Sequence, residues 1–188
     1  NSMQLIQYLP EKGPLEAGEQ IIALEQTAWP SGADQAVFPS APHTYVTSFA
    51  FFEHGKAVCH VGIRKALLLH NGVNYLAYGI SEVVTHPSFR HQGLATRLLG
   101  LSAEFILSQG ADISIFTCAP SRVPFYTRNG WCPCPNSCLV GGTKQQPFRS
   151  ALLGLITMIR FISDRAIAHR QAFEQTDIFL ELGQGQLW

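Results

Sequence analysis

Apolar and polar residues alternate in several short β-rich stretches through the first half of the chain. Two turn signals separate three of these stretches: Glu53–Lys56 suits a hairpin turn, and Asn71-Gly72 is a strong one because both residues tolerate positive φ. Further upstream, apolar residues recur at helical spacing as far as Pro30. The predicted elements of this half are strands at 3–9, 45–52, 57–69 and 73–85, a helix at 15–29 and a long loop at 30–43.

The second half changes to alternating helices and strands. From Gly93 onward, apolar residues recur every three or four positions, which predicts a helix at 93–108. The other predicted elements are a strand at 111–117, a short helix at 124–128, a strand at 131–140, either a strand or a helix at 151–162, and a helical segment at 164–174. A meander followed by such alternation predicts one mixed α/β sheet with helices on its faces, in a single domain of residues 1–188.

Composition and charge narrow the class of protein. Of the 188 residues, 46% are hydrophobic and only 14% are charged, which excludes a largely disordered chain. Lys and Arg together number 13, as do Asp and Glu, so there is no basic excess to hold a nucleic-acid backbone. The longest apolar stretch, at 151–162, is too short to cross a bilayer, and no signal peptide is evident. We therefore expect a soluble, cytoplasmic protein that binds neither nucleic acid nor membrane.

The five cysteines follow neither a metal-site nor a disulfide pattern. Cys132, Cys134 and Cys138 have a C-x-C-x3-C spacing, which lacks the paired C-x2-C knuckles of structural zinc sites. An odd number of cysteines in a chain of this size also argues against a disulfide-stapled secreted module. We expect reduced thiols and no metal site.

One loop has the features of a phosphate site. A β-branched strand ending at Val83-Val84-Thr85 leads into a loop, and a helix opens at Gly93. The first N–H groups of a helix lack internal acceptors and lie at the positive end of its dipole, so they attract anions. Gly93 and Ala95 have little bulk, and Arg90 can add charge-assisted hydrogen bonds. A phosphate site is one interpretation of this pattern, and an ordinary strand–helix connection is the other.

The same loop resembles a motif of a known family. Arg90-His91-Gln92-Gly93-Leu94-Ala95 matches the R/Q-x-x-G-x-G/A motif of the GCN5-related N-acetyltransferases (GNAT), and Pro124–Trp131 resembles their F-Y-x-x-x-G-F segment. The resemblance covers most of the chain between Tyr45 and Leu139. It implies a mostly antiparallel central sheet with helices on both faces, and acetyl-CoA as cofactor. In the family, the pantetheine arm pairs with the strand that ends here at Thr85. The implied cofactor-binding residues are Val83, Val84, Thr85, Arg90, His91, Gln92, Gly93, Leu94, Ala95 and Thr96.

A narrower resemblance is to the aminoglycoside 2′-N-acetyltransferases. Arg128–Pro133 looks like their R-x-G-W-x-P segment, and the chain ends in a segment similar to their C-D-x-R-x-G-D-x-W tail, which closes the substrate site. Gly185 and Trp188 match that tail, whereas Gln186 stands where its second Asp is expected. The subgroup binds its polycationic substrates with carboxylates, so one expected acid is missing here. Residues 143–188 would complete the sheet and the substrate site of a core domain at 3–142.

The resemblance also suggests which residues do the chemistry. Tyr126 falls on the family's tyrosine, the general acid that protonates the departing thiolate. The subgroup's glutamate falls on Ser81, and Glu82 comes one residue later, where strand alternation would point it to the other face unless a bulge intervenes. The base is therefore either Glu82 or the C-terminal carboxylate of Trp188. The candidate substrate-binding residues are Asp34, Ser81 and Glu181.

The expected function is acetyl transfer from acetyl-CoA to a primary amine of a small molecule. The 2′-amino group of an aminoglycoside is the first candidate acceptor. Two alternatives stay open: acetylation of a lysine or N-terminal amine of a protein, and a regulatory acyl-CoA-binding module without turnover. The chain could act as a homodimer.

Overall fold

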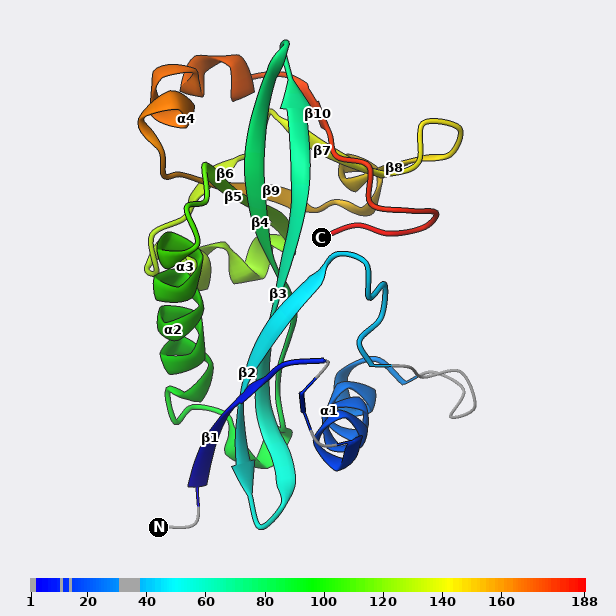
Figure 1. Cartoon of the computed structure of the whole chain (residues 1–188), viewed down its shortest axis with the longest axis vertical. Helices are drawn as coiled ribbons and strands as arrows, with labels where there is room; N and C mark the ends of the chain where they lie inside the picture. The colour runs from blue at the N-terminus through cyan, green and yellow to red at the C-terminus, as the bar shows by residue number, and fades with distance from the viewer. Residues whose placement is uncertain (1–2, 11, 14, 31–37) are drawn as a thin grey trace. The chain divides into compact units, whose positions relative to one another are not determined.

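Two long strands of the predicted meander organise the computed structural model, which describes residues 3–10, 12–13, 15–30 and 38–188 (Figure 1). They are β3 (Lys56–His70) and β4 (Val73–Thr85). The chain divides into two units. The first comprises Asn1–Arg64 and Ser81–Ala103, and the second comprises Lys65–Ile80 and Glu104–Trp188. Both units therefore contain part of β3 and part of β4.

The first unit is built on the beginning of the meander. Its other elements are β1 (Met3–Tyr8), α1 (Leu15–Ala28), β2 (Tyr45–Glu53) and most of α2 (Leu94–Ser108). The strand order is β1-β2-β3-β4, and β2 is antiparallel to both β1 and β3. His54 and Gly55 join β2 to β3 with φ angles of 50° and 77°, so the predicted hairpin turn is confirmed.

Helices cover both faces of this sheet, α1 on one and α2 on the other (Figure 1). On the α1 face, Ile21 packs in a buried cluster with Ala50 and Phe52. On the α2 face, the guanidinium of Arg97 lies 4.7 Å from the centroid of the Phe51 ring. Because both faces are covered, the consecutive residues Ala50, Phe51 and Phe52 are all buried.

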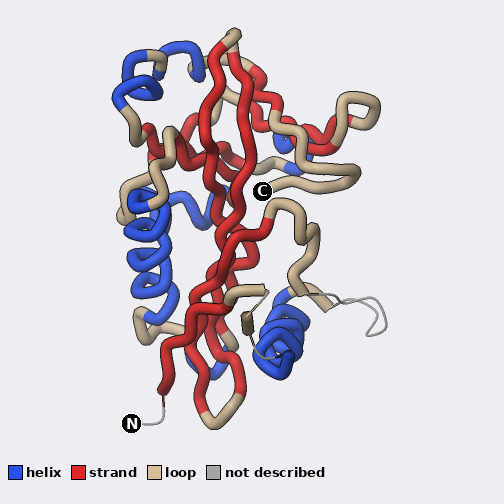
Figure 2. The backbone as a smooth tube through the Cα atoms, viewed as in Figure 1, coloured by secondary structure: helices blue, strands red, loops and turns tan. Residues whose placement is uncertain are grey.

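The second unit continues from the other halves of the two long strands. Its further elements are β5 (Ile113–Cys118), α3 (Val123–Thr127), β6 (Cys132–Cys134), β7 (Cys138–Gly142), β8 (Pro147–Arg149), β9 (Ile156–Phe161), α4 (Asp164–Ala168) and β10 (Asp177–Phe179). β5 runs parallel to β4, and β9 lies between β5 and β6, antiparallel to both. A separate three-stranded sheet has the order β10-β7-β8, and Figure 1 labels its strands. Figure 2 shows the helices of the chain in blue and its strands in red.

Two regions of the second unit differ from the sequence prediction. The single strand predicted at 131–140 is wrong, because β6 and β7 are separate strands that belong to different sheets. Pro135 and Asn136 lie in the turn between them, where a proline cannot donate to a strand ladder. The ambiguous stretch at 151–162 contains the end of a 3-10 helix (Ser150–Leu153) followed by β9. The predicted helical segment at 164–174 divides into α4 and a 3-10 helix at Arg170–Phe173.

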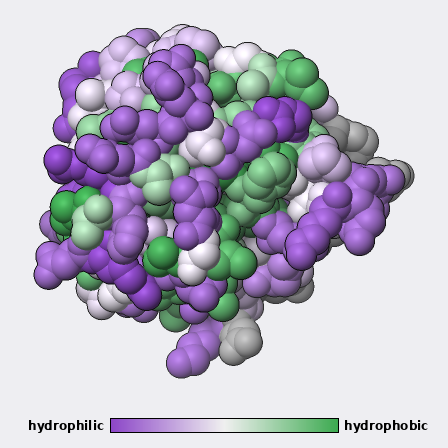
Figure 3. Space-filling model, turned by 90° about the horizontal axis from the view of Figure 1, so that it is seen from above, coloured by the Kyte–Doolittle hydropathy of each residue, from purple (hydrophilic) through white to green (hydrophobic). Residues whose placement is uncertain are grey.

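The predicted fold class is confirmed: the strands are mostly antiparallel, with helices in both units. None of the helices in the described ranges is long and apolar enough to cross a membrane. All five cysteines are free thiols. Large exposed hydrophobic side chains include Leu67, Leu152 and Phe179. Figure 3 shows hydrophobic and hydrophilic side chains interspersed over the face that it presents.

Candidate active site

The loop between β4 and α2 has the geometry of an anion site. The carbonyl of Gly93 accepts the first helical hydrogen bond from the N–H of Arg97 (3.1 Å), so the N–H groups of the next three residues have no acceptor within the helix. Gly93 has a φ of 75°, and an added Cβ there would meet no atom within 4 Å. The backbone of this helix start therefore faces open space, which is what a pyrophosphate group would need.

The side chains of the loop fit the same use. Arg90, His91 and Gln92 are exposed, and Arg90 forms no ion pair with any residue that the structure describes. Leu94 is buried, so only its backbone N–H is available to a ligand. His86 has a local role, because its Nδ1 accepts a hydrogen bond from the N–H of Ser88 (3.1 Å). The loop could thus hold a phosphate by backbone amides and one free guanidinium.

The end of the strand before this loop has one edge without a strand partner among the described residues. β4 pairs with β5 only at Ala77 and Tyr78, so residues 83–85 have no partner in β5. Val84 is buried in the α1-face cluster and can offer only backbone groups. An extended amide-bearing ligand could add to this edge as another strand would.

A groove of about 630 Å³ also lies within the first unit. It is lined by residues of α1, by the β2–β3 hairpin and by His86, Ser88 and Phe89. It therefore reaches the beginning of the phosphate loop. None of its lining residues belongs to the carboxylate cluster around Glu82, so the two features are separate.

The backbone at Glu82 breaks the regular alternation of β4. Its φ is 54°, a left-handed value that costs a residue with a Cβ about 1 kcal/mol or more. As a result, two neighbouring residues of β4 bind the same arginine. Arg64 Nε donates to Ser81 Oγ (3.1 Å), and Arg64 Nη2 donates to Glu82 Oε1 (2.6 Å). In a regular strand, neighbouring side chains would point to opposite faces. The left-handed residue therefore brings Ser81 and Glu82 to one guanidinium, and so interrupts the alternation as a bulge would.

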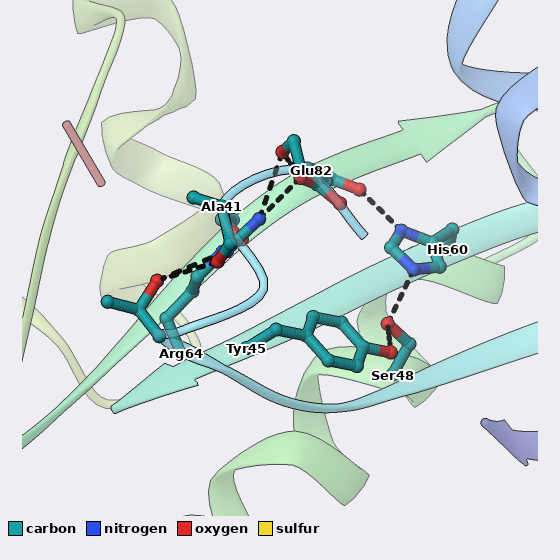
Figure 4. Close-up of polar contacts among 9 residues, drawn as sticks. Ala41, Tyr45, Ser48, His60, Arg64 and Glu82 are labelled. Carbon is teal, nitrogen blue, oxygen red and sulfur yellow. Dashed lines mark hydrogen bonds and ion pairs between the residues drawn. The ribbon is translucent and has the colours of Figure 1, made fainter. Parts of the chain in front are cut away.

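Arg64 fixes the Glu82 carboxylate as its buried counter-charge (Figure 4). Its side chain is 4% exposed and that of Glu82 is 14% exposed. The guanidinium also donates to the carbonyl of Ala41 (2.8 Å), to Thr44 Oγ1 (3.2 Å) and to Ser40 Oγ (3.1 Å). Ser40 Oγ in turn donates to Glu82 Oε1 (2.6 Å). Residues 40–44 are thereby tied to β4 through a single arginine.

A hydrogen-bond chain fixes the backbone of Glu82 from the other side (Figure 4). His60 Nδ1 lies 2.7 Å from the carbonyl oxygen of Glu82, and because a carbonyl only accepts, Nδ1 carries the proton. The neutral ring then accepts at Nε2 from Ser48 Oγ (2.7 Å), which accepts from the Tyr45 hydroxyl (2.5 Å). Burial lowers the pKa of His60, so the ring stays neutral. The chain thus supports the strained residue that carries the carboxylate.

Tyr126 lies in the second unit, in an aromatic environment. Its ring lies 4.8 Å from that of Phe116 and 5.0 Å from that of Phe125, measured between centroids. Its hydroxyl has no hydrogen-bond partner among the residues with described positions. Burial, and then the nearby Cys118 thiol, raise the pKa of Tyr126 above its ordinary value, although Arg122 opposes them. The hydroxyl is therefore protonated at neutral pH and free to donate, as a general acid must be.

The C-terminal segment of the second unit is anchored. The side chain of Trp188 is buried and packs over Gly79, where an added Cβ would collide with the indole ring. The carbonyl oxygen of Trp188 accepts from both the N–H and the hydroxyl of Thr117 in β5. The tail is therefore folded onto β4 and β5 within this unit.

Residues 18–134 match the family model of the acetyltransferase (GNAT) domain, which is more than half of the chain. The chain belongs to the GNAT acetyltransferase family. It is therefore classed with the acyltransferases, and acetyl-CoA is the co-substrate of this fold.

Solved GNAT structures share this fold at low sequence identity. YhbS, a GNAT family N-acetyltransferase from Escherichia coli in complex with CoA, is 13% identical, with 95% of this chain and 89% of that chain covered and a TM-score of 0.61. A GNAT family acetyltransferase from Brucella melitensis in complex with acetyl-CoA is 16% identical over 69% of this chain and 82% of its own, with a TM-score of 0.51. No curated protein matches the sequence.

A longer protein is also similar. A conserved protein from Enterococcus faecalis, a probable N-acyltransferase, is 19% identical, with a TM-score of 0.57. The match covers 70% of this chain but only 32% of that protein, so the chain spans about a third of its length. At such identities the likeness shows the fold alone.

The GNAT site residues predicted from the sequence fall in both units. Glu82, Ser81 and the cofactor loop belong to the first unit, and Tyr126, Glu181 and Trp188 to the second. Ser81 binds Arg64, so the structure gives its hydroxyl a partner in the protein. Glu181 is exposed, and Asp34 lies outside the described residues.

Sequence reasoning missed the residues that surround Glu82 in this GNAT chain. Arg64 and His60 are buried polar residues in the apolar middle of β3, and Gly62 lies between them on the same face. An added Cβ at Gly62 would come 3.0 Å from the carbonyl oxygen of Ser81, so the glycine leaves room for β4 to approach. The alternating H-x-G-x-R pattern was the signal that could have identified this polar face.

Proposed function

We propose that the chain is an acetyl-CoA-dependent N-acetyltransferase that acetylates a primary amine of a small molecule. The observation that carries this proposal is the Glu82 carboxylate, held at a left-handed break near the end of β4, the strand that leads to the open helix start. A buried charge of this kind is costly unless it is fully paired, and incompletely paired buried charges are typical of functional sites. Among the described residues, no donor pairs with the buried Glu82 Oε2 when every carboxyl group is taken as ionised.

Residues of this chain can carry out each step of the proposed reaction. Acetyl-CoA supplies the acetyl group as a thioester. Glu82 takes a proton from the acceptor ammonium, directly or through one water molecule, so that the amine becomes a nucleophile. Tyr126 holds a proton on its hydroxyl at neutral pH and donates it to the leaving sulfur. The helix start after Gly93, with Arg90, binds the pyrophosphate.

For the acceptor, we propose an aminoglycoside and its 2′-amino group. Support comes from the Arg128–Pro133 segment and from the tail, whose Trp188 packs inward instead of projecting into solvent. A tail folded over the sheet suits a small acceptor better than the open groove that a protein substrate would require. The proposed carboxylates for a polycation are Glu82, Glu181 and Asp34.

A panel assay tests the proposal. Release of CoA from acetyl-CoA would be followed with kanamycin- and gentamicin-type aminoglycosides, simple polyamines, and peptides bearing a free lysine or N-terminal amine. We expect turnover with the aminoglycosides and none with the peptides. Glu82→Gln should abolish most of this turnover, and Glu53→Gln, an acid at the other end of the same unit, should retain it.

Other outcomes would replace the proposal. Turnover confined to peptides would indicate a protein acetyltransferase. Thermal stabilisation by acetyl-CoA without turnover on any amine would indicate an acyl-CoA-binding module. Turnover on aminoglycosides that survives Glu82→Gln would assign the base to another group, the Trp188 carboxylate first.

A further inference from the structure

A second carboxyl group lies against Glu82. Glu25 comes from α1, on the sheet face that also carries His60, and ligand-capable atoms of Glu25, His60 and Glu82 all lie within 4.8 Å of one another. Glu25 Oε1 and Glu82 Oε2 are both buried, and neither has a hydrogen-bond partner when both groups are taken as carboxylates. Two carboxyl groups lie this close, each with a buried oxygen that can only accept, which is an arrangement that folded proteins avoid.

The charges around the pair allow only one ionised carboxylate. Arg64 brings one positive charge, and its guanidinium is already bound to Glu82, Ser81, Ser40, Thr44 and Ala41. His60 is neutral, because Nδ1 donates to a carbonyl and Nε2 accepts from Ser48. Among the described residues, the hydroxyls of Ser48 and Tyr45 continue the hydrogen-bond chain from His60, and both are neutral. With both carboxylates ionised, the buried cluster would carry a net negative charge.

We propose that Glu25 holds one proton and shares it with Glu82, and that the pair acts as a single proton-transfer unit for the base. One proton removes both unpaired oxygens, since the Glu25 hydroxyl can donate to Glu82 Oε2. The pair then has one negative charge, which Arg64 balances. The sharing rests on this geometry alone, whereas its role in catalysis rests on the proposed function. Glu25 is a positioning residue, because it acts through Glu82.

The electrostatics of Glu25 point in the same direction. Burial raises its pKa, the negative charge and hydrogen bond of Glu82 raise it further, and Arg64 opposes them, with a resulting pKa of about 9. Glu25 is therefore protonated at neutral pH. Two carboxyl groups this close titrate as a pair, as in other carboxyl dyads.

Sharing a proton with Glu25 gives Glu82 a way to pass the proton that it accepts on to solvent. When Glu82 accepts a proton from the acceptor ammonium, the N–H bond breaks and an O–H bond forms on Glu82. Glu25 can then release its own proton to solvent, because its side chain is only partly buried. The pair again holds one proton and one negative charge, and no step requires two buried anions.

A bound divalent cation is the competing interpretation of the same three residues. A cation would need a lone pair on His60, but Nδ1 carries the proton and the Nε2 lone pair accepts from Ser48. Binding would therefore break the hydrogen bonds that support the left-handed residue. A proton shared by Glu25 and Glu82 accounts for their close approach and leaves the hydrogen bonds of His60 intact.

Carbon-13 NMR of the glutamate carboxyl groups tests the sharing without any substrate. We expect one carboxyl resonance of the wild type to stay protonated above pH 7, and to be lost in Glu25→Gln. Glu19→Gln, an exposed acid on the same helix, should retain it. Glu82→Gln should shift its titration to lower pH, because the neighbouring negative charge is removed. A wild type with every carboxyl ionised at pH 7, a resonance that persists in Glu25→Gln, or a resonance shifted by added zinc would overturn the proposal.

The pH profile of kcat/KM tests the catalytic role separately. We expect the wild type to lose activity above the titration of the pair, and Glu25→Gln to lose this alkaline limb while its KM stays within about twofold. An unchanged alkaline limb in Glu25→Gln would overturn the catalytic role of Glu25 even if the NMR result holds. A protein that turns over no amine but shows the shared proton would retain the sharing and refute the proposed function.

Discussion

The two proposed catalytic groups are kept in opposite kinds of surroundings. Glu82, in the first unit, is surrounded by charged and polar partners that fix its backbone and one carboxylate oxygen. Tyr126, in the second unit, lies among aromatic rings, and its hydroxyl has no hydrogen-bond partner in the described part of that unit. The difference follows from what each group must hold. A carboxylate stays ionised in a buried place only with partners, whereas a phenol keeps its proton through burial alone.

The largest effect on stability should come from removing Arg64, the counter-charge of Glu82 in the first unit. Arg64→Met leaves the Glu82 carboxylate buried without a cation, and should lower the free energy of unfolding by about 3–5 kcal/mol. Chemical denaturation measures this, and the double variant with Glu82→Gln should recover part of the loss. Arg165→Met, at the more exposed Arg165–Asp112 pair, should cost about 1 kcal/mol or less. Equal losses for the two arginines would show that burial of the pair is unimportant.

The aromatic surroundings of the second unit predict the opposite behaviour for Tyr126. Tyr126→Phe removes a hydroxyl that has no partner, so stability should change little while kcat falls by about a hundred- to a thousandfold. KM for acetyl-CoA should stay close to that of the wild type. Tyr75→Phe, a buried tyrosine against Phe173, should leave turnover unchanged and is the matched control. A large loss of stability in Tyr126→Phe would mean that the hydroxyl has a structural role.

A substitution against the packed C-terminal tail of the second unit should have a smaller effect on stability. Gly79→Ala places a methyl group against the Trp188 ring and 3.0 Å from the carbonyl oxygen of Ile115. We expect a cost of about 1–3 kcal/mol and altered tryptophan fluorescence as the ring moves. Gly100→Ala, where an added Cβ meets nothing within 4 Å, is the control and should not destabilise the protein. Fluorescence identical to the wild type in Gly79→Ala would contradict the position of Trp188.

The smallest effect, taken over a single pH unit, is a slope of stability with pH that belongs to the first unit. Glu25 has a pKa raised from 4.5 to about 9 in the folded state, so between these values the folded chain holds a proton that the unfolded chain releases. Stability from this group is therefore complete below pH 4.5 and is lost as pH rises toward 9, by at most about 1.4 kcal/mol per pH unit. Glu25→Gln should flatten this slope in thermal melts, and Tyr126→Phe should leave it unchanged over the same range.

Local sequence signals predicted most elements of the first unit and the cofactor loop. His54-Gly55 adopts the positive φ angles of a two-residue hairpin, as does Asn71-Gly72 in the second unit, and Gly93 has a positive φ directly before α2. These conformations depend on residues that are adjacent in sequence, so a local pattern is enough to predict them. The division of 131–140 into β6 and β7 was missed, because it depends on which strand each half pairs with.

Glu82 illustrates both what the local sequence predicts and what tertiary contacts decide. The sequence by itself determined that a carboxylate lies near the end of the strand that leads into a loop suited to a phosphate. Only the tertiary structure decided which way it points, because its φ of 54° is held by His60 of β3, and its carboxylate by Arg64 of β3 and Ser40. Glu25, from α1, completes the cluster. Long-range contacts of this kind can support a strained residue that no neighbour in sequence would favour, and a local pattern contains no record of them.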